Sequence, residues 1–202
     1  MDRADSQDRA LRARAEAVIP GGMYGHQSTV LLPDDYPQFF ARGEGAHIWD
    51  EDGRRYLDLM CAYGPNLFGY ANPEIDAAFV RRLGLGDTLT GPTALMVELA
   101  EALTALVSHA EWAIFCKNGT DATSMALSIS RAHTGRRVVV RARGAYHGAA
   151  AWCTPRPAGV IDSDRAHQLF CDYNDVASLE AAVAEAGDDL ACVFAAPFKH
   201  DA

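Results

Sequence analysis

The chain has 202 residues, of which 49% are hydrophobic, and its 27 acidic and 18 basic side chains give a formal net charge of −9. This composition excludes a disordered tail, a collagen-like repeat and a membrane protein. The acidic balance argues against a nucleic-acid or anionic-membrane partner, because phosphate backbones require a cationic surface. The first 16 residues are rich in charge and hold no apolar stretch, so we expect no secretory signal and a cytoplasmic protein.

In the first quarter of the chain, a helix is predicted over residues 9–18, and it ends at Pro20-Gly21-Gly22. Two short strands are expected at 46–50 and 54–60. They are joined by Glu51-Asp52-Gly53, in which Asp-Gly indicates a hairpin whose central residues both accept positive φ.

Two helices are expected next. Asn72-Pro73-Glu74 supplies an N-cap, a proline at the first helical position and an acid in the first turn. Gly91-Pro92 opens a second helix, whose buried face is predicted to comprise Met96, Leu99, Ala100, Leu103 and Val107.

From residue 112 onward, apolar strands alternate with helical patterns. Strands are expected at 112–116, 138–140, 168–171 and 190–195. A helix over 119–133 turns Ala122, Met125, Ala126 and Ile129 inward, and another, capped by Asn174 or Asp175, carries the stripe Leu179, Ala182, Val183 and Ala186. Continuously apolar strands alternating with helices indicate an α/β fold, with a mostly parallel sheet covered on both faces.

The five cysteines are odd in number, and no two of them have C-x-x-C spacing. The seven histidines are equally scattered. We therefore expect reduced thiols and no metal site.

The segment Cys116-Lys117-Asn118-Gly119-Thr120 runs from a predicted strand through a glycine directly into a helix. Unpaired N–H groups at a helix start form an anion-binding site that suits a phosphate group, and Thr120 adds a hydroxyl donor. The motif lacks the glycine spacing of a Walker loop or a dinucleotide fingerprint, so on its own it also fits a simply capped helix.

A second stretch, Gly144-Ala145-Tyr146-His147-Gly148, follows the strand at 138–140. Ligands collect at the carboxyl ends of parallel strands, so this loop is expected on the same edge as the first. Tyr146 has the shape to stack on a flat heteroaromatic ring while the glycines admit the backbone. Taken alone, the stretch equally fits a half-buried loop tyrosine and a satisfied histidine.

Together these stretches resemble the class III pyridoxal-phosphate aminotransferases, and within them the glutamate-1-semialdehyde aminomutases. The resemblance runs in order from about residue 9 to the end. It rests on Ile19-Pro20-Gly21-Gly22, Asp50-Glu51-Asp52-Gly53, residues 63–73, Gly91-Pro92-Thr93, residues 118–123, residues 131–136, Tyr146-His147-Gly148 and Tyr173-Asn174-Asp175.

This resemblance implies a fold-type I enzyme that uses pyridoxal 5'-phosphate to transfer amino groups through a Schiff-base intermediate, acting as a homodimer on small-molecule amino donors and acceptors. It assigns residues 1–70 to an amino-terminal helix and hairpin segment and 71–202 to the first part of the large cofactor-binding domain. By position, Asn118, Gly119 and Thr120 hold the cofactor phosphate. Tyr146 stacks on its ring with His147 beside it, Tyr63 and Tyr24 lie near the substrate, and the loop 88–93 lies near the dimer interface.

Two departures from the aminomutase pattern argue for a modified substrate. Ser28 stands where the aminomutases carry the arginine that binds the substrate carboxylate, and Ala196-Pro197-Phe198 replaces the usual Glu-Pro. Without that guanidinium the chain has no evident carboxylate clamp.

The chemistry also requires a lysine for the Schiff base and an acid at the pyridine nitrogen. The resemblance places both beyond residue 202. Only two of the basic residues are lysines: Lys117 is expected at the surface, and Lys199 occupies a different position in the expected sheet. The alternative is a truncated, non-catalytic scaffold that binds a phosphate ligand or a partner chain.

Overall fold

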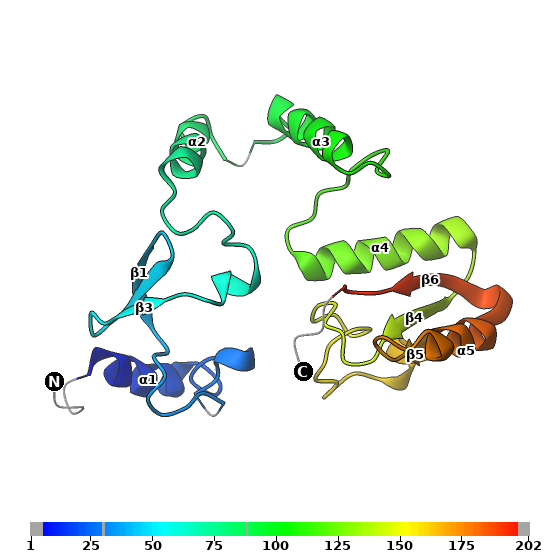
Figure 1. Ribbon diagram of the computed structural model, residues 1–202, viewed down its shortest axis with the longest axis horizontal. Coiled ribbons are helices and arrows are strands. Elements are labelled where there is room, and N and C mark those ends of the chain that lie inside the picture. Colours follow the sequence, from blue (N-terminus) through cyan, green and yellow to red (C-terminus); the bar gives the residue numbers. More distant parts are fainter. Residues whose placement is uncertain (1–5, 30, 88, 198–202) are drawn as a thin grey trace. The chain divides into compact units, whose positions relative to one another are not determined.

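The computed structural model describes residues 6–29, 31–87 and 89–197, which are drawn in colour in Figure 1. The chain forms two compact units, Met1–Pro92 and Thr93–Ala202. Each unit has its own sheet, and each is described by itself.

The first unit begins with helix α1 (Gln7–Val18), which confirms the helix predicted at 9–18. Its start is held by the hairpin: the Ser6 hydroxyl donates to Asp52 Oδ2 and the Gln7 amide to Asp52 Oδ1, each at 2.6 Å. A carboxylate at this end is favourable because the first amides of a helix are unpaired and carry partial positive charge.

An antiparallel sheet follows, with strands β1 (Phe40–Glu44), β2 (His47–Asp50) and β3 (Arg55–Leu57) in the order β1-β2-β3. The hairpin between β2 and β3 was predicted, but β1 was not, because its sequence shows no alternation of apolar and polar residues and most of its side chains are exposed. In the turn, Gly53 has φ +80° and donates to the Asp50 carbonyl at 3.0 Å. Asp52 does not have positive φ, so the expectation of two such residues was wrong.

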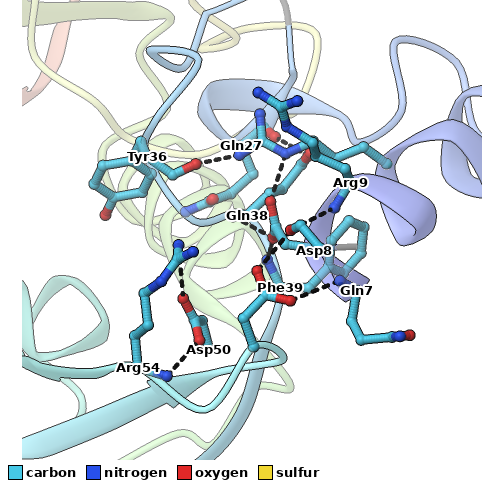
Figure 2. A network of polar contacts seen from close by, with 12 residues as sticks. Gln7, Asp8, Arg9, Gln27, Tyr36, Gln38, Phe39, Asp50 and Arg54 are labelled. Atoms are coloured by element: carbon cyan, nitrogen blue, oxygen red, sulfur yellow. Dashed lines mark hydrogen bonds and ion pairs between the residues drawn. The ribbon is translucent and has the colours of Figure 1, made fainter. Parts of the chain in front are cut away.

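Two buried carboxylates organise this unit: Asp8 joins α1 to the segment before β1, and Asp50 holds the hairpin between β2 and β3, as Figure 2 shows. Asp8 accepts from the backbone amides of Gln38 and Phe39 at 2.9 and 2.8 Å and from Arg12 Nε at 2.7 Å. Asp50, only 1% exposed, accepts from the Arg54 amide at 2.7 Å and from the Tyr56 hydroxyl. Each carboxylate thereby satisfies backbone donors that lie just outside the strands.

Helices α2 (Pro73–Leu83) and α3 (Ala94–Leu106) form as predicted. Asn72 caps α2 by accepting from the amides of Glu74 and Ile75. The predicted burial along α3 holds only in part: Met96 and Leu99 are 47% and 48% exposed, whereas Ala100, Leu103 and Val107 are half-buried.

The second unit holds a parallel sheet in the order β5-β4-β6, formed by β4 (Val138–Ala142), β5 (Gln168–Cys171) and β6 (Leu190–Phe194). Helix α4 (Gly119–Thr134) packs on β6, and α5 (Val176–Ala186), capped by Asp175, packs on β5 and β4. Val140, Ala142, Ala145, Cys171 and Ala182 form the core on the α5 side. The predicted α/β class and parallel sheet are confirmed.

Two local predictions failed in this unit. Residues 112–116 are not a strand, since no described strand lies beside them to complete a ladder. The inward stripe of α4 was misplaced: Met125 is 45% exposed, whereas Leu127 is buried.

Short 3₁₀ turns occupy Gly25–Gln27, Cys61–Tyr63, Asp162–Arg165 and Gly187–Asp189. None of the helices described by the structure combines the length and apolarity needed to cross a bilayer.

Candidate cofactor site

The start of α4 presents an open set of backbone donors. Asn118 is the N-cap: its Oδ1 accepts from the Asp121 amide and its Nδ2 donates to Asp121 Oδ2, both at 3.0 Å. The amides of Gly119 and Thr120 have no acceptor among the described residues. The side chain of Asn118 is thus used within the helix, and the next two amides remain available at the positive end of the helix.

The loop that follows β4 lies directly against this helix start. The Ala149 amide donates to Thr120 Oγ1 at 3.1 Å, and Thr123 Oγ1 donates to the His147 carbonyl at 2.7 Å. Gly148 has φ +113°, and a Cβ at this position would lie 2.6 Å from Thr120 Oγ1. Only glycine permits this approach of the loop to α4, for both conformational and steric reasons.

These groups fit a phosphate. A Cβ added at Gly119 would meet no atom within 4 Å, so the helix start is open on the side toward which that Cβ would point. Thr120 Oγ1 accepts its hydrogen bond from Ala149, which leaves the hydroxyl hydrogen available for an anionic oxygen. Amides and a hydroxyl donor at a helix N-terminus are a common arrangement for phosphate binding.

Tyr146 and His147 are adjacent in sequence but lie in opposite environments. The Tyr146 side chain is 61% exposed. His147 is 6% exposed, stacks on Trp152 with ring centroids 6.4 Å apart, and meets the edge of Phe194 at 5.6 Å. Burial lowers the pKa of His147 and the nearby positive charge of Arg141 lowers it further, so the imidazole is neutral at pH 7.

Trp152 and Phe194 enclose His147, and this role was not predicted for either residue. Trp152 Nε1 donates to Ser124 Oγ at 3.1 Å, and its ring lies 5.5 Å from that of Phe194. One signal was available: Thr120, Thr123 and Ser124 recur at helical spacing and place three hydroxyls on one face of α4.

Tyr63 and Tyr24, expected near the substrate, belong to the first unit, whereas the helix start and the Tyr146 loop belong to the second. Tyr63 ends a run of three non-glycine residues with positive φ, from +47° to +63°. Asp58 supports this strained turn by accepting from the amides of Met60 and Cys61 at 2.8 and 3.2 Å. Tyr24 is 78% exposed.

Neither lysine is a candidate for the Schiff-base lysine within the described residues. Lys117 is exposed beside the helix start, in line with its expected surface position. Lys199 lies outside the described residues.

Comparison with known proteins decides the family. The family model for class-III aminotransferases matches residues 32–175. The chain belongs to the class-III aminotransferase family. The resemblance inferred from the sequence motifs is therefore confirmed.

Two curated class-III relatives align with nearly the whole chain. An aminopentol aminotransferase from Sphingopyxis macrogoltabida is 56% identical over 196 residues, which are 97% of this chain and 46% of the relative. A glutamate-1-semialdehyde 2,1-aminomutase from Neisseria gonorrhoeae is 34% identical over 206 residues, covering 96% and 48%. The chain thus spans about half the length of these relatives.

Solved structures of transaminases and related proteins are also similar to this chain. The FumI protein of Sphingopyxis sp. MTA144, in its pyridoxal-phosphate internal aldimine form, is 57% identical with a TM-score of 0.92 over 96% of this chain and 47% of that one. An omega-transaminase from Sphaerobacter thermophilus is 30% identical, with a TM-score of 0.87 over 96% and 48%. These similarities confirm the expected fold type I.

Proposed function

We propose that the full-length protein carrying this chain transfers amino groups with pyridoxal phosphate as its cofactor, and that residues 118–120 and 146–148 form the phosphate and ring side of the site. The observation that carries the proposal is the open helix start of α4, joined to the Gly148 loop through Thr120. Family membership adds independent support.

Each group has a defined task in this proposal. Pyridoxal phosphate, when bound, acts as an electron sink for carbanions formed next to the transferred nitrogen. The amides of Gly119 and Thr120 and the Thr120 hydroxyl hold the phosphate, while Asn118 keeps the helix start in place. Tyr146 covers one face of the ring, and the buried, neutral His147 supports the loop from beneath.

The proposed substrate is an amino polyol of the aminopentol kind, not glutamate semialdehyde. The relative named aminopentol aminotransferase is 56% identical, against 34% for the aminomutases. Ser28 stands at the aminomutase arginine position, and its hydroxyl donates to the Gly21 carbonyl at 3.2 Å. A serine cannot form the bidentate pair that a carboxylate substrate favours. Tyr24 and Tyr63 are the proposed substrate contacts.

We further propose a cytoplasmic homodimer in which residues 1–70 form an amino-terminal segment and 71–202 begin the cofactor domain. The acidic composition supports the absence of a nucleic-acid or membrane partner.

The proposal is tested on the full-length protein by titrating the apoprotein with pyridoxal phosphate and following the cofactor absorbance. Thr120→Val should weaken cofactor binding about tenfold, because a hydrogen bond to a charged group is lost. Ser128→Ala is the matched control, since within the described residues the Ser128 hydroxyl bonds its own helix at Ser124 O and no other group. Absence of saturable binding by the unaltered protein would overturn the proposal.

The substrate proposal is tested separately. The loaded protein should transfer the amino group of aminopentol to a 2-oxo acid. Efficient conversion of glutamate semialdehyde to 5-aminolevulinate would contradict it.

A further inference from the structure

The first two turns of α4 carry a row of hydroxyls that all contact the loop after β4. Thr120 Oγ1 accepts from the Ala149 amide, Thr123 Oγ1 donates to the His147 carbonyl, and Ser124 Oγ accepts from Trp152 Nε1. Residues three and four apart share one helix face, so these contacts form a single seam. The seam joins the helix whose amides face the phosphate to the loop that carries Tyr146.

Within this seam, Thr123 has the shortest bond. Its hydroxyl lies 2.7 Å from the His147 carbonyl and 3.1 Å from its own helix carbonyl at Thr120, so the single hydrogen has its better acceptor in the loop. The other donor to the His147 carbonyl is the Cys153 thiol at 3.4 Å, which is a weak one. Thr123 therefore provides the main anchor of the peptide between His147 and Gly148.

That anchor lies between the two parts of the proposed site. Tyr146, which precedes His147, is mostly exposed. Gly148, which follows His147, touches Thr120. The imidazole of His147 is fixed between Trp152 and Phe194. With both the side chain and the carbonyl of His147 held, the backbone leaves little freedom for the placement of Tyr146.

We propose that Thr123 is a positioning residue that sets the Tyr146 ring relative to the phosphate-binding amides of α4 without touching the cofactor. The inference rests on the proposed function, because it takes Tyr146 as the residue that covers the cofactor ring. Thr123 acts through the His147 carbonyl: its hydroxyl hydrogen-bonds there, and the register of loop against helix follows.

The test compares Thr123→Val, which keeps the shape of the side chain but removes the hydroxyl, with Thr123→Ser, which keeps the hydroxyl. In the full-length protein, Thr123→Val should raise the Kd for pyridoxal phosphate about three- to tenfold, the size expected for one lost hydrogen bond. It should also reduce the circular dichroism of the bound cofactor, which reports ring orientation. Thr123→Ser should retain the Kd and the circular dichroism of the unaltered protein, and Ser128→Ala should change neither quantity.

Two further measurements separate positioning from plain stabilisation. In the apoprotein, hydrogen exchange of the Gly148 and Ala149 amides should quicken in Thr123→Val while the centre of α4 stays protected. In a double-mutant cycle, Tyr146→Ala should remove most of the effect of Thr123→Val on the Kd, because the two act through one contact.

Unchanged affinity and dichroism in Thr123→Val would overturn the inference while leaving the proposed function intact. Equal effects of Thr123→Val with and without the Tyr146 ring would overturn it as well, since Thr123 would then act on stability alone. If the unaltered protein binds no pyridoxal phosphate, the proposed function fails first and the inference with it.

Discussion

At the scale of single residues, His147 is unusual because it is buried beside positive charge. Its Nε2 has no partner among the described residues, and Arg141, itself 7% exposed, is the charged group that lowers its pKa. The rings of Trp152 and Phe194 and the thiol of Cys153 complete its surroundings. A buried base with these neighbours disfavours its protonated form.

This environment predicts acid sensitivity near neutral pH. The pKa of His147 lies below its ordinary 6.5 in the folded state, so as pH falls through 6.5 the unfolded chain takes up a proton that the folded chain does not. Thermal stability should therefore fall between pH 7.5 and 5.5, and less so in His147→Gln. The pKa values of Asp58 and Asp189 are lowered, so these carboxylates do not titrate in this window. Equal slopes of melting temperature against pH would contradict the prediction.

At the scale of elements, the attachment of α1 to the rest of its unit depends on carboxylates: Asp8 bonds the segment before β1, and Asp52 in the hairpin turn bonds the start of α1. Asp8 is the centre of this attachment, because it holds two consecutive amides just before β1 and the Arg12 guanidinium of its own helix at once.

Asp8→Ala should therefore destabilise the protein by about 3 kcal/mol, since it leaves two amides without their acceptor and a largely buried guanidinium without its charged partner. Chemical denaturation monitored by circular dichroism measures the change. Glu44→Ala is the control: it removes an exposed ion pair with Arg42 and should change stability by less than about 0.5 kcal/mol. A similar loss in both variants would show that Asp8 is not a special anchor.

At the scale of the whole molecule, the proposed homodimer makes a prediction for the loop 88–93. Gly91 tolerates a side chain within its own chain, because an added Cβ would meet no atom within 4 Å and its φ is not positive. An arginine there finds open space for its Cβ within its own chain, and it introduces bulk and charge wherever a second copy lies against this loop.

Gly91→Arg should raise the dimer dissociation constant of the full-length protein at least about tenfold, because a bulky charge would be forced into a close contact. Light scattering during size-exclusion chromatography over a dilution series measures it. Asp188→Arg, at an exposed turn after α5, should leave the dimer unchanged. An unaltered dimer in Gly91→Arg would place this loop away from the interface.

Local signals in the sequence were sufficient for much of this protein. Caps and breakers located helices: Asn72 and Asp175 supply side-chain caps, and α1 ends just before Pro20-Gly21-Gly22. The run Asn118-Gly119-Thr120 predicted an open helix start because its chemistry lies within one turn of the chain. The alternation of apolar strands with helices likewise determined the parallel sheet.

Only the tertiary structure decided which faces are buried and what holds the site together. The stripes of α3 and α4 were misjudged because burial depends on the neighbour that a helix meets, which periodicity does not specify. The close approach of Gly148 to Thr120, the Thr123 bond to the His147 carbonyl, and the enclosure of His147 by Trp152 and Phe194 join residues from separate segments. The sequence by itself determined the helices and the chemistry of the helix start, because both arise from neighbouring residues; it missed β1 and placed at 112–116 a strand that does not form. The seam between α4 and the Tyr146 loop required the fold, because it is a contact across more than twenty intervening residues.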